Sequence, residues 1–82
     1  MSLETHPARP SPQDKLVTMA NQIARFMESK PYAEGREGLA SHINDFWEPR
    51  MRRQLFDMLD AGGAGLRPLV IDAAPLIRRP SA

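Results

Sequence analysis

The chain has no cysteine among its 82 residues, which excludes disulfide bonds, thiolate metal sites, iron–sulfur ligation and a cysteine nucleophile. Histidine is nearly as scarce: His6 and His42 belong to no set of three or four metal ligands with a recognisable spacing. Aromatic residues make up only 6% of the chain, so a domain of this length buries a modest core. These shortages argue against a self-contained enzyme.

Long apolar runs and a large net charge are also missing. The longest aliphatic run away from the N-terminus is Leu69-Val70-Ile71, whereas a membrane-spanning helix needs about 20 apolar residues. The segment up to Pro12 has no apolar run suited to a signal peptide. A net charge of +1 is too small to predict a nucleic-acid or membrane-surface protein from bulk charge. We therefore expect a cytoplasmic chain that binds no membrane.

The hydrophobic pattern has helical periodicity and no strand-like alternation. It predicts an all-α fold, a small bundle of three to four short helices formed by residues 13–77. Residues 1–12 are proline-rich and polar, and residues 78–82 are also polar. We expect residues 1–12 to form a disordered or extended N-terminal arm and residues 78–82 a C-terminal tail.

Proline and glycine mark the expected helix ends. Ser11 and Pro12 are typical of a helix start, and the first helix is expected to run to about Ser29, before Pro31. A connection through Tyr32, Gly35 and Gly38 should follow.

The second helix is then expected to carry four large apolar residues on one side and to stop or bend at Glu48-Pro49: Leu39, Ile43, Phe46 and Trp47. Pro49 suits the start of a third helix, which Gly62-Gly63 should end. Its apolar stripe consists of Met51, Leu55, Met58 and Leu59. A short fourth helix is expected from Pro68, limited by Pro75.

Two motifs that resemble catalytic sites have simpler explanations. Ser41, His42 and Asp45 include the residue types of a hydrolase triad, but consecutive helical residues point about 100° apart and cannot pair as nucleophile and base. The run Gly62-Gly63-Ala64-Gly65 follows a helix and lacks the Lys-Ser/Thr of a phosphate-binding loop. A helix end and a turn explain this run.

The best candidate for a binding surface is the Phe46–Arg53 segment. Arg50, Arg52 and Arg53 form the only basic cluster, and arginine is enriched at interface centres. A solvated face with intrachain pairs remains the alternative for this cluster. Phe46 and Trp47 point in different directions, so one can enter the core while the other reaches a partner, although core placement of both also stays open.

Three segments resemble the delta subunit of NAD-dependent formate dehydrogenase: residues 14–26, 42–52 and 62–70. The most specific part is His42-Ile43-Asn44, followed by Phe46-Trp47 and Pro49-Arg50-Met51-Arg52. The resemblance covers most of residues 14–77, and Pro75 departs from the uninterrupted helix expected there.

The resemblance implies a noncatalytic accessory subunit that supports assembly or stability of a cytoplasmic complex. In that complex, a large alpha subunit carries a molybdenum or tungsten pterin and iron–sulfur clusters. Beta and gamma subunits pass electrons from formate through FMN to NAD, and the delta chain carries no known cofactor. We expect the chain to dock on the alpha subunit through Phe46, Trp47, Arg50, Arg52 and Arg53, with Asn21 and His42 on the same surface or supporting it.

The alternative from another class is a small dimeric helical protein that binds nucleic acid through Arg50, Arg52 and Arg53. The small net charge and the neighbouring Glu48 and Asp57 argue against it. The sequence leaves open whether the isolated chain self-associates and whether it is a permanent subunit or a transient assembly factor.

Overall fold

A computed structural model describes residues 12–80, in which four α-helices and one 3₁₀-helix follow one another. They are α1 (Pro12–Met27), α2 (Tyr32–Phe46), α3 (Pro49–Asp60), α4 (Pro68–Ala73) and η1 (Ala74–Leu76). The all-α prediction is confirmed, and no strand occurs in the part of the chain that the structure describes. The expected cap Ser11 and the rest of the arm, residues 1–11, lie outside the described residues.

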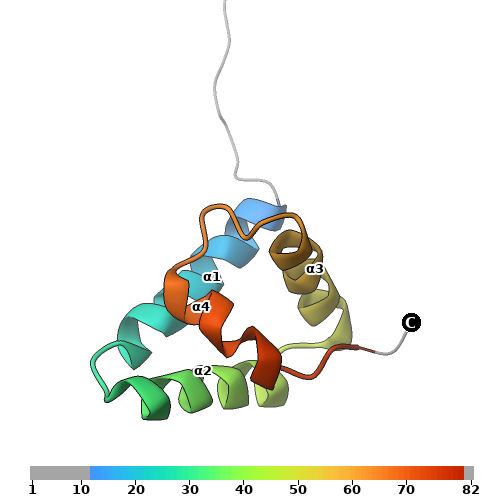
Figure 1. The fold of residues 1–82 in the computed structure, drawn as a ribbon. Coiled ribbons are helices and arrows are strands. Elements are labelled where there is room, and N and C mark those ends of the chain that lie inside the picture. Colours follow the sequence, from blue (N-terminus) through green and yellow to red (C-terminus); the bar gives the residue numbers. More distant parts are fainter. Residues whose placement is uncertain (1–11, 81–82) are drawn as a thin grey trace, which may run out of the picture.

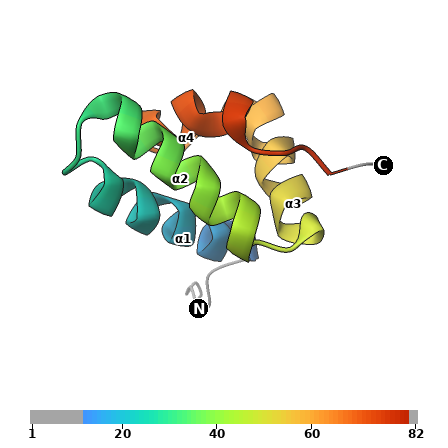
Figure 2. The ribbon, with the colours of Figure 1, turned by 90° about the horizontal axis from the view of Figure 1, so that it is seen from below.

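The first three helices form the sides of a triangle, and α4 lies across it (Figure 1). α4 contacts both α1 and α2, whereas α3 contacts α1. Seen from below, α2 runs beside α1 on one side and beside α4 on the other (Figure 2). The short last helix therefore closes the bundle.

The core where these helices meet is entirely hydrophobic. Its largest fully buried side chains are Leu39, Ile43, Leu55 and Val70, which come from α2, α3 and α4. Complete burial of one such side chain contributes about 1.5–3 kcal/mol. No polar or charged side chain among the residues with a described burial is buried, so the polar side chains that bond to other elements lie at the edges of the bundle.

The connection between α1 and α2 is shorter than the sequence predicted. α1 ends at Met27 and α2 begins at Tyr32, so Tyr32, Gly35 and Gly38 lie inside α2 rather than in a loop. The two glycines allow α2 to approach the end of α1 closely. A Cβ at position 35 would overlap the carbonyl oxygen of Met27, and one at position 38 would lie 2.9 Å from the sulfur of Met27. Helix propensity disfavours glycine inside a helix, so it does not predict these two positions. The close packing of α2 against α1 explains why glycine occurs there.

The turn after α3 has the geometry that the glycine pair predicted. The Gly63 N–H donates to the Met58 carbonyl at 2.8 Å, and the Gly62 N–H donates to the Leu59 carbonyl at 3.1 Å. Gly62 has a φ of +114°, which a residue with a side chain rarely adopts. This is a Schellman motif, and it satisfies two of the last carbonyls of α3.

Candidate partner-binding surface

Phe46 and Trp47 are neighbours with opposite surroundings at the corner between α2 and α3. Trp47 follows the last residue of α2, its N–H donates to the Ile43 carbonyl at 3.0 Å, and its side chain is only 5% exposed. Phe46 is 72% exposed. The expectation that Phe46 lies on the core side of α2 is therefore wrong, because the chain leaves the helix at Trp47 and turns that side chain inward instead.

The exposed ring of Phe46 is supported from within its own helix. The ring of His42, one turn earlier in α2, has its centroid 4.9 Å from that of Phe46, with the two planes tilted by 38°. Pro49 starts α3 three residues after Phe46. The corner thus presents a large aromatic ring on a short, well-packed segment.

The three arginines at the start of α3 have different surroundings. Arg50 and Arg53 are exposed. Arg52 is half-buried and turns toward the protein, where its Nε donates to the Trp47 carbonyl at 3.3 Å and its Nη1 to the Arg78 carbonyl at 2.6 Å. Arg52 therefore connects the corner to the tail.

Asn21 faces the connection between α3 and α4 rather than the corner. Its Nδ2 donates to the Gly65 carbonyl at 2.8 Å, and its Oδ1 accepts a hydrogen bond from the Arg67 N–H at 2.9 Å. Arg67 precedes α4 and has no capping side chain of its own. Asn21 thus satisfies the main chain at the start of α4, and the structure does not bring its amide group to the surface formed by Phe46 and Arg50.

Sequence reasoning missed the role of Asn44 at the other end of this segment. Its Nδ2 donates to the Leu76 carbonyl at 3.1 Å, and its Oδ1 accepts from the Arg78 N–H at 2.7 Å. Arg79 then lies with its guanidinium 4.2 Å from the centre of the Phe56 ring. The expected tail therefore begins with two residues held against the domain. The signal for this role in the sequence was the position of Asn44, a polar residue close to the core face of α2.

Two side-chain pairs, one an ion pair and one a phenol–carboxylate hydrogen bond, connect the α4 region to the end of α1 and the start of α2. Arg67 donates from two nitrogens to the two carboxylate oxygens of Glu28, both at 2.8 Å. These bonds lower the pKa of Glu28 and raise that of Arg67. The Tyr32 hydroxyl donates to Asp72 at 2.7 Å, and this bond to the neutral phenol raises the pKa of Tyr32. Both pairs are exposed and hold the bundle together at its edge.

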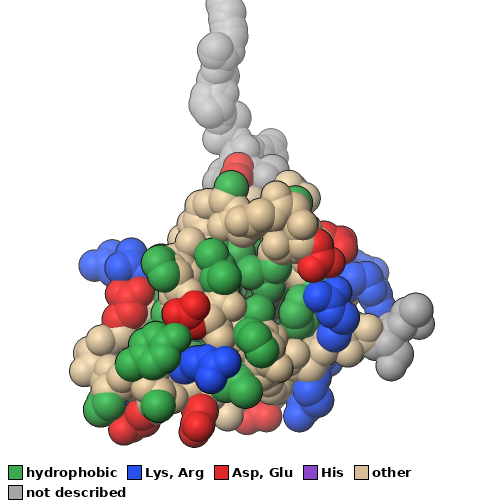
Figure 3. Space-filling view, in the orientation of Figure 1, with side chains coloured by type: hydrophobic (Ala, Val, Ile, Leu, Met, Phe, Trp, Pro, Cys, Tyr) green, Lys and Arg blue, Asp and Glu red, His purple; other side chains and the backbone are tan. Residues whose placement is uncertain are grey.

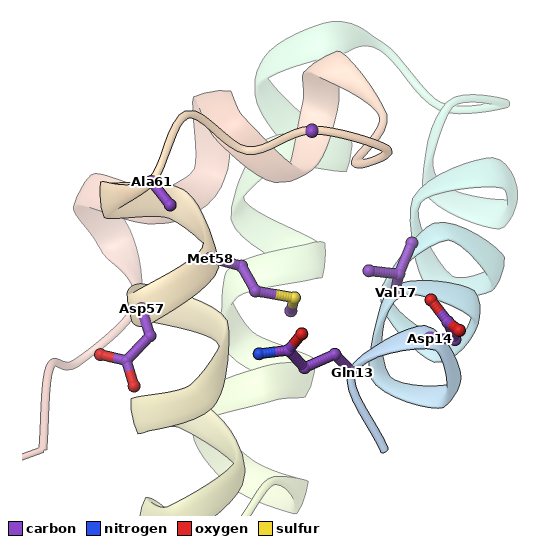
Figure 4. A pocket seen from close by; sticks show the side chains of 7 residues that line it. Gln13, Asp14, Val17, Asp57, Met58 and Ala61 are labelled. Atoms are coloured by element: carbon purple, nitrogen blue, oxygen red, sulfur yellow. The ribbon is translucent and has the colours of Figure 1, made fainter. Parts of the chain in front are cut away.

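Shallow grooves lie between the helices. One of about 280 Å³ separates the start of α1 from the end of α3, where Val17 and Met58 point toward each other and Gln13 extends beside them (Figure 4). Another of about 450 Å³ lies between α3 and the α4–η1 segment. Its lining is mainly apolar: Phe56, Leu59, Asp60, Ile71, Ala74, Pro75, Ile77 and Arg79. Hydrophobic side chains gather over α4 on this face of the molecule (Figure 3).

No group of three or more His, Asp or Glu side chains within residues 12–80 could hold a metal ion. Nor does any helix in the same range have the length and apolar character needed to cross a membrane.

A comparison with protein families supports the resemblance seen in the sequence. The model of the family NADH-dependent formate dehydrogenase delta subunit FdsD matches residues 15–74, which extend from α1 into η1. No curated protein and no solved structure matches the chain. Because the family match covers most of the chain, from the first helix to the last, the protein belongs to the family of formate dehydrogenase delta subunits.

Proposed function

We propose that this chain is a noncatalytic accessory subunit that docks on the large subunit of a formate dehydrogenase and stabilises the assembled complex. The docking surface in this proposal is the α2–α3 corner, with Phe46 at its centre and His42, Arg50 and Arg53 around it. Trp47 and Arg52 support this surface from inside the protein, since they hold the corner to the core and the tail. The molybdenum or tungsten pterin, the iron–sulfur clusters, FMN and NAD would all belong to the other subunits of a cytoplasmic complex.

The exposure of Phe46 is the observation that carries this proposal. Leaving a phenylalanine 72% exposed forgoes most of the favourable burial of its ring, about 1.5–3 kcal/mol. Binding a partner would recover that burial. Because Trp47 fixes the main chain beside it, Phe46 has little backbone freedom to lose on binding, and large aromatic residues placed in this way contribute strongly to interfaces.

Arginine chemistry supports a protein partner at the same corner. Arg50 and Arg53 are one turn apart on α3 and both exposed. Their guanidinium groups can each donate two parallel hydrogen bonds to a carboxylate, which gives a contact with defined geometry. An aromatic centre with arginines beside it is the composition expected of an interface core and its surroundings.

A subunit without a reacting group can still raise the activity of its complex. If the chain binds the folded, cofactor-loaded state of the large subunit more tightly than open states, it shifts the population toward the loaded state. The shift grows with the concentration of the chain relative to its dissociation constant. Assembly and thermal stability of the complex should therefore depend on this chain more than the chemical step does.

The test is co-purification of the other subunits with tagged chain variants. Phe46→Ala should reduce recovery of the large subunit, while Phe26→Ala should not. Phe26 is a suitable control because it is also highly exposed, at 64%, but lies on α1. Equal recovery with both variants would remove Phe46 from the docking surface. No recovery with the unmodified chain would refute the accessory-subunit proposal itself.

A further inference from the structure

Arginines that are distant in the sequence come together where the tail runs along α3, through one hydrogen bond of Arg52. One group lies in the first two turns of that helix, and the other follows η1 in the tail. The hydrogen bond from Arg52 to the Arg78 carbonyl joins the groups across 26 positions of sequence. We name the two exposed residues Arg78 and Arg79 the arginine surface, and Arg52 lies beneath it and holds the Arg78 main chain. In Figure 3, Lys and Arg side chains gather next to α3 and the tail, at the right of the view.

The tail follows one face of α3, so its arginines have defined positions. Arg52, Phe56 and Asp60 are spaced by four residues and therefore lie on the same face of the helix. Arg78 contacts the first of them, and Arg79 lies over the ring of the second while pairing with Asp60 at 3.3 Å. Asn44 fixes the Arg78 main chain from the other side.

The charges of α3 oppose the helix dipole. No acidic residue stands in its first turn and no basic residue in its last, whereas its arginines cluster near the start, and Asp57 and Asp60 near the end. The helix dipole favours the reverse order, with acidic residues at the N-terminal end and basic residues at the C-terminal end. Helix stability therefore does not account for the arginines, and the dipole adds to the positive potential that they create. A residue pattern that breaks a local stability rule is expected where a binding function requires it.

We propose that the arginine surface docks a carboxylate-rich segment of another subunit of the formate dehydrogenase. This inference rests on the proposed function and adds the chemistry of the partner and the contribution of the tail. Arg79 already shows the recognition geometry, because its two terminal nitrogens each approach one oxygen of Asp60 at 3.3 Å. Both side chains of that pair are 60% exposed, so a carboxylate from a partner can replace Asp60.

A carboxylate partner fits the surroundings better than a polyphosphate does. Asp60 pairs with Arg79, and the nearby sequence carries further exposed acidic residues, namely Asp45 and Glu48 before α3 and Asp57 within it. They would repel a continuous phosphate backbone, and the net charge of +1 provides little general attraction. A protein segment can place single carboxylates opposite single arginines and avoid these acidic positions.

The experiment measures binding of the full-length chain to formate dehydrogenase purified without it, over a range of salt concentrations. The test variant is Arg78→Glu with Arg79→Glu, and the matched control is Lys15→Glu with Arg25→Glu on α1, which changes the net charge equally. The test variant should bind about tenfold more weakly or worse. Its two glutamates would repel the carboxylates of the partner that the two arginines attract. The control should stay close to the unmodified chain, and salt should weaken binding of the unmodified chain more than that of the test variant.

A second variant tests the inference without reversing any charge in the tail. Asp60→Asn removes the intrachain competitor for Arg79, so the affinity should rise. Equal effects of the two charge-reversal variants, or a loss of affinity in Asp60→Asn, would overturn the inference. So would tighter, salt-sensitive binding of the unmodified chain to a random DNA duplex. In contrast, an unmodified chain that fails to bind the enzyme would refute the proposed function before the arginine surface is tested.

Discussion

Asn21 and Asn44 bridge the main chain in the same way at the two ends of the α4–η1 segment. Each side-chain amide donates to one carbonyl and accepts from an N–H two residues further along: Gly65 and Arg67 for Asn21, Leu76 and Arg78 for Asn44. The first amide comes from α1 and the second from α2. Together they fix a segment that is too short to be a stable helix alone.

Replacing either asparagine by alanine should therefore destabilise the whole domain. Each change removes two hydrogen bonds, with an expected loss of about 1–2 kcal/mol in the free energy of unfolding. Urea denaturation followed by circular dichroism measures this loss. Gln22→Ala is the control, because Gln22 is an exposed neighbour on α1 and its change should have little effect. Equal losses for Gln22 and Asn21 would contradict the bridging role.

The two glycines of α2 should respond differently to alanine. At Gly35 the new methyl group would meet the Met27 carbonyl oxygen, a main-chain atom that cannot move freely, so Gly35→Ala should destabilise the domain by about 1–3 kcal/mol. At Gly38 it would meet the flexible end of the Met27 side chain, and the higher helix propensity of alanine, about 1 kcal/mol, should offset the contact. Thermal denaturation of both variants compares them. A Gly35 variant as stable as the Gly38 variant would show that α1 and α2 pack less closely.

Alanine variants of the two neighbouring aromatic residues at the α2–α3 corner should distinguish a residue needed for stability from one available for binding. Trp47→Ala removes a buried side chain and should cost about 3–5 kcal/mol, whereas Phe46→Ala should change the free energy of unfolding by less than about 0.5 kcal/mol. The unfolding midpoint in urea, measured by circular dichroism, gives both values. In the unmodified chain the single tryptophan also reports unfolding, since its fluorescence should shift to longer wavelength as Trp47 becomes exposed. A large loss in Phe46→Ala would mean that its ring supports the core.

The Glu28–Arg67 pair predicts a loss of stability in acid. Because the pKa of Glu28 is lower in the folded state than its ordinary value of 4.5, the folded state holds the charged carboxylate more strongly. The stabilisation is complete above pH 4.5 and disappears as the pH falls through the lower, folded-state value. Unfolding free energies measured between pH 7 and the acid range should show this decline.

Glu28→Gln should flatten that part of the pH profile, while Glu37→Gln, an exposed carboxylate on α2, serves as the control. An unchanged profile in Glu28→Gln would show that other carboxylates cause the acid sensitivity. At the alkaline end the sign is opposite for Tyr32. Its pKa is raised by the bond to Asp72, so that contribution is complete below pH 10 and disappears as the pH rises through the folded-state value.

Local chemistry predicted most helix ends correctly. Pro12, Pro49 and Pro68 each begin a helix, because proline suits the first turn, and Gly62-Gly63 ends α3, because glycine adopts positive φ readily. Pro31 ends the turn after α1, although α1 stops at Met27, two residues before the expected end. The family could also be identified from the sequence, since the segment from His42 to Arg52 combines rare residues in a specific order.

Several residues could not be interpreted without tertiary contacts. Gly35 and Gly38 suggested a loop, but their meaning depends on Met27 in another helix. Asn21 was expected near the binding surface, yet its partners are 44 and 46 positions away. The proposed docking residues of the corner and the arginine surface remain predictions that binding measurements must test.

The all-α class, the ends of most helices and the family follow from local sequence features, because they depend on periodicity, on proline and glycine, and on residue order. The packing of the helices, by contrast, sets which of Phe46 and Trp47 enters the core, and it places the tail arginines along α3. These outcomes depend on where separate helices meet and on which buried space remains when they pack. Contacts between residues far apart in the chain leave no local pattern from which such placement can be inferred.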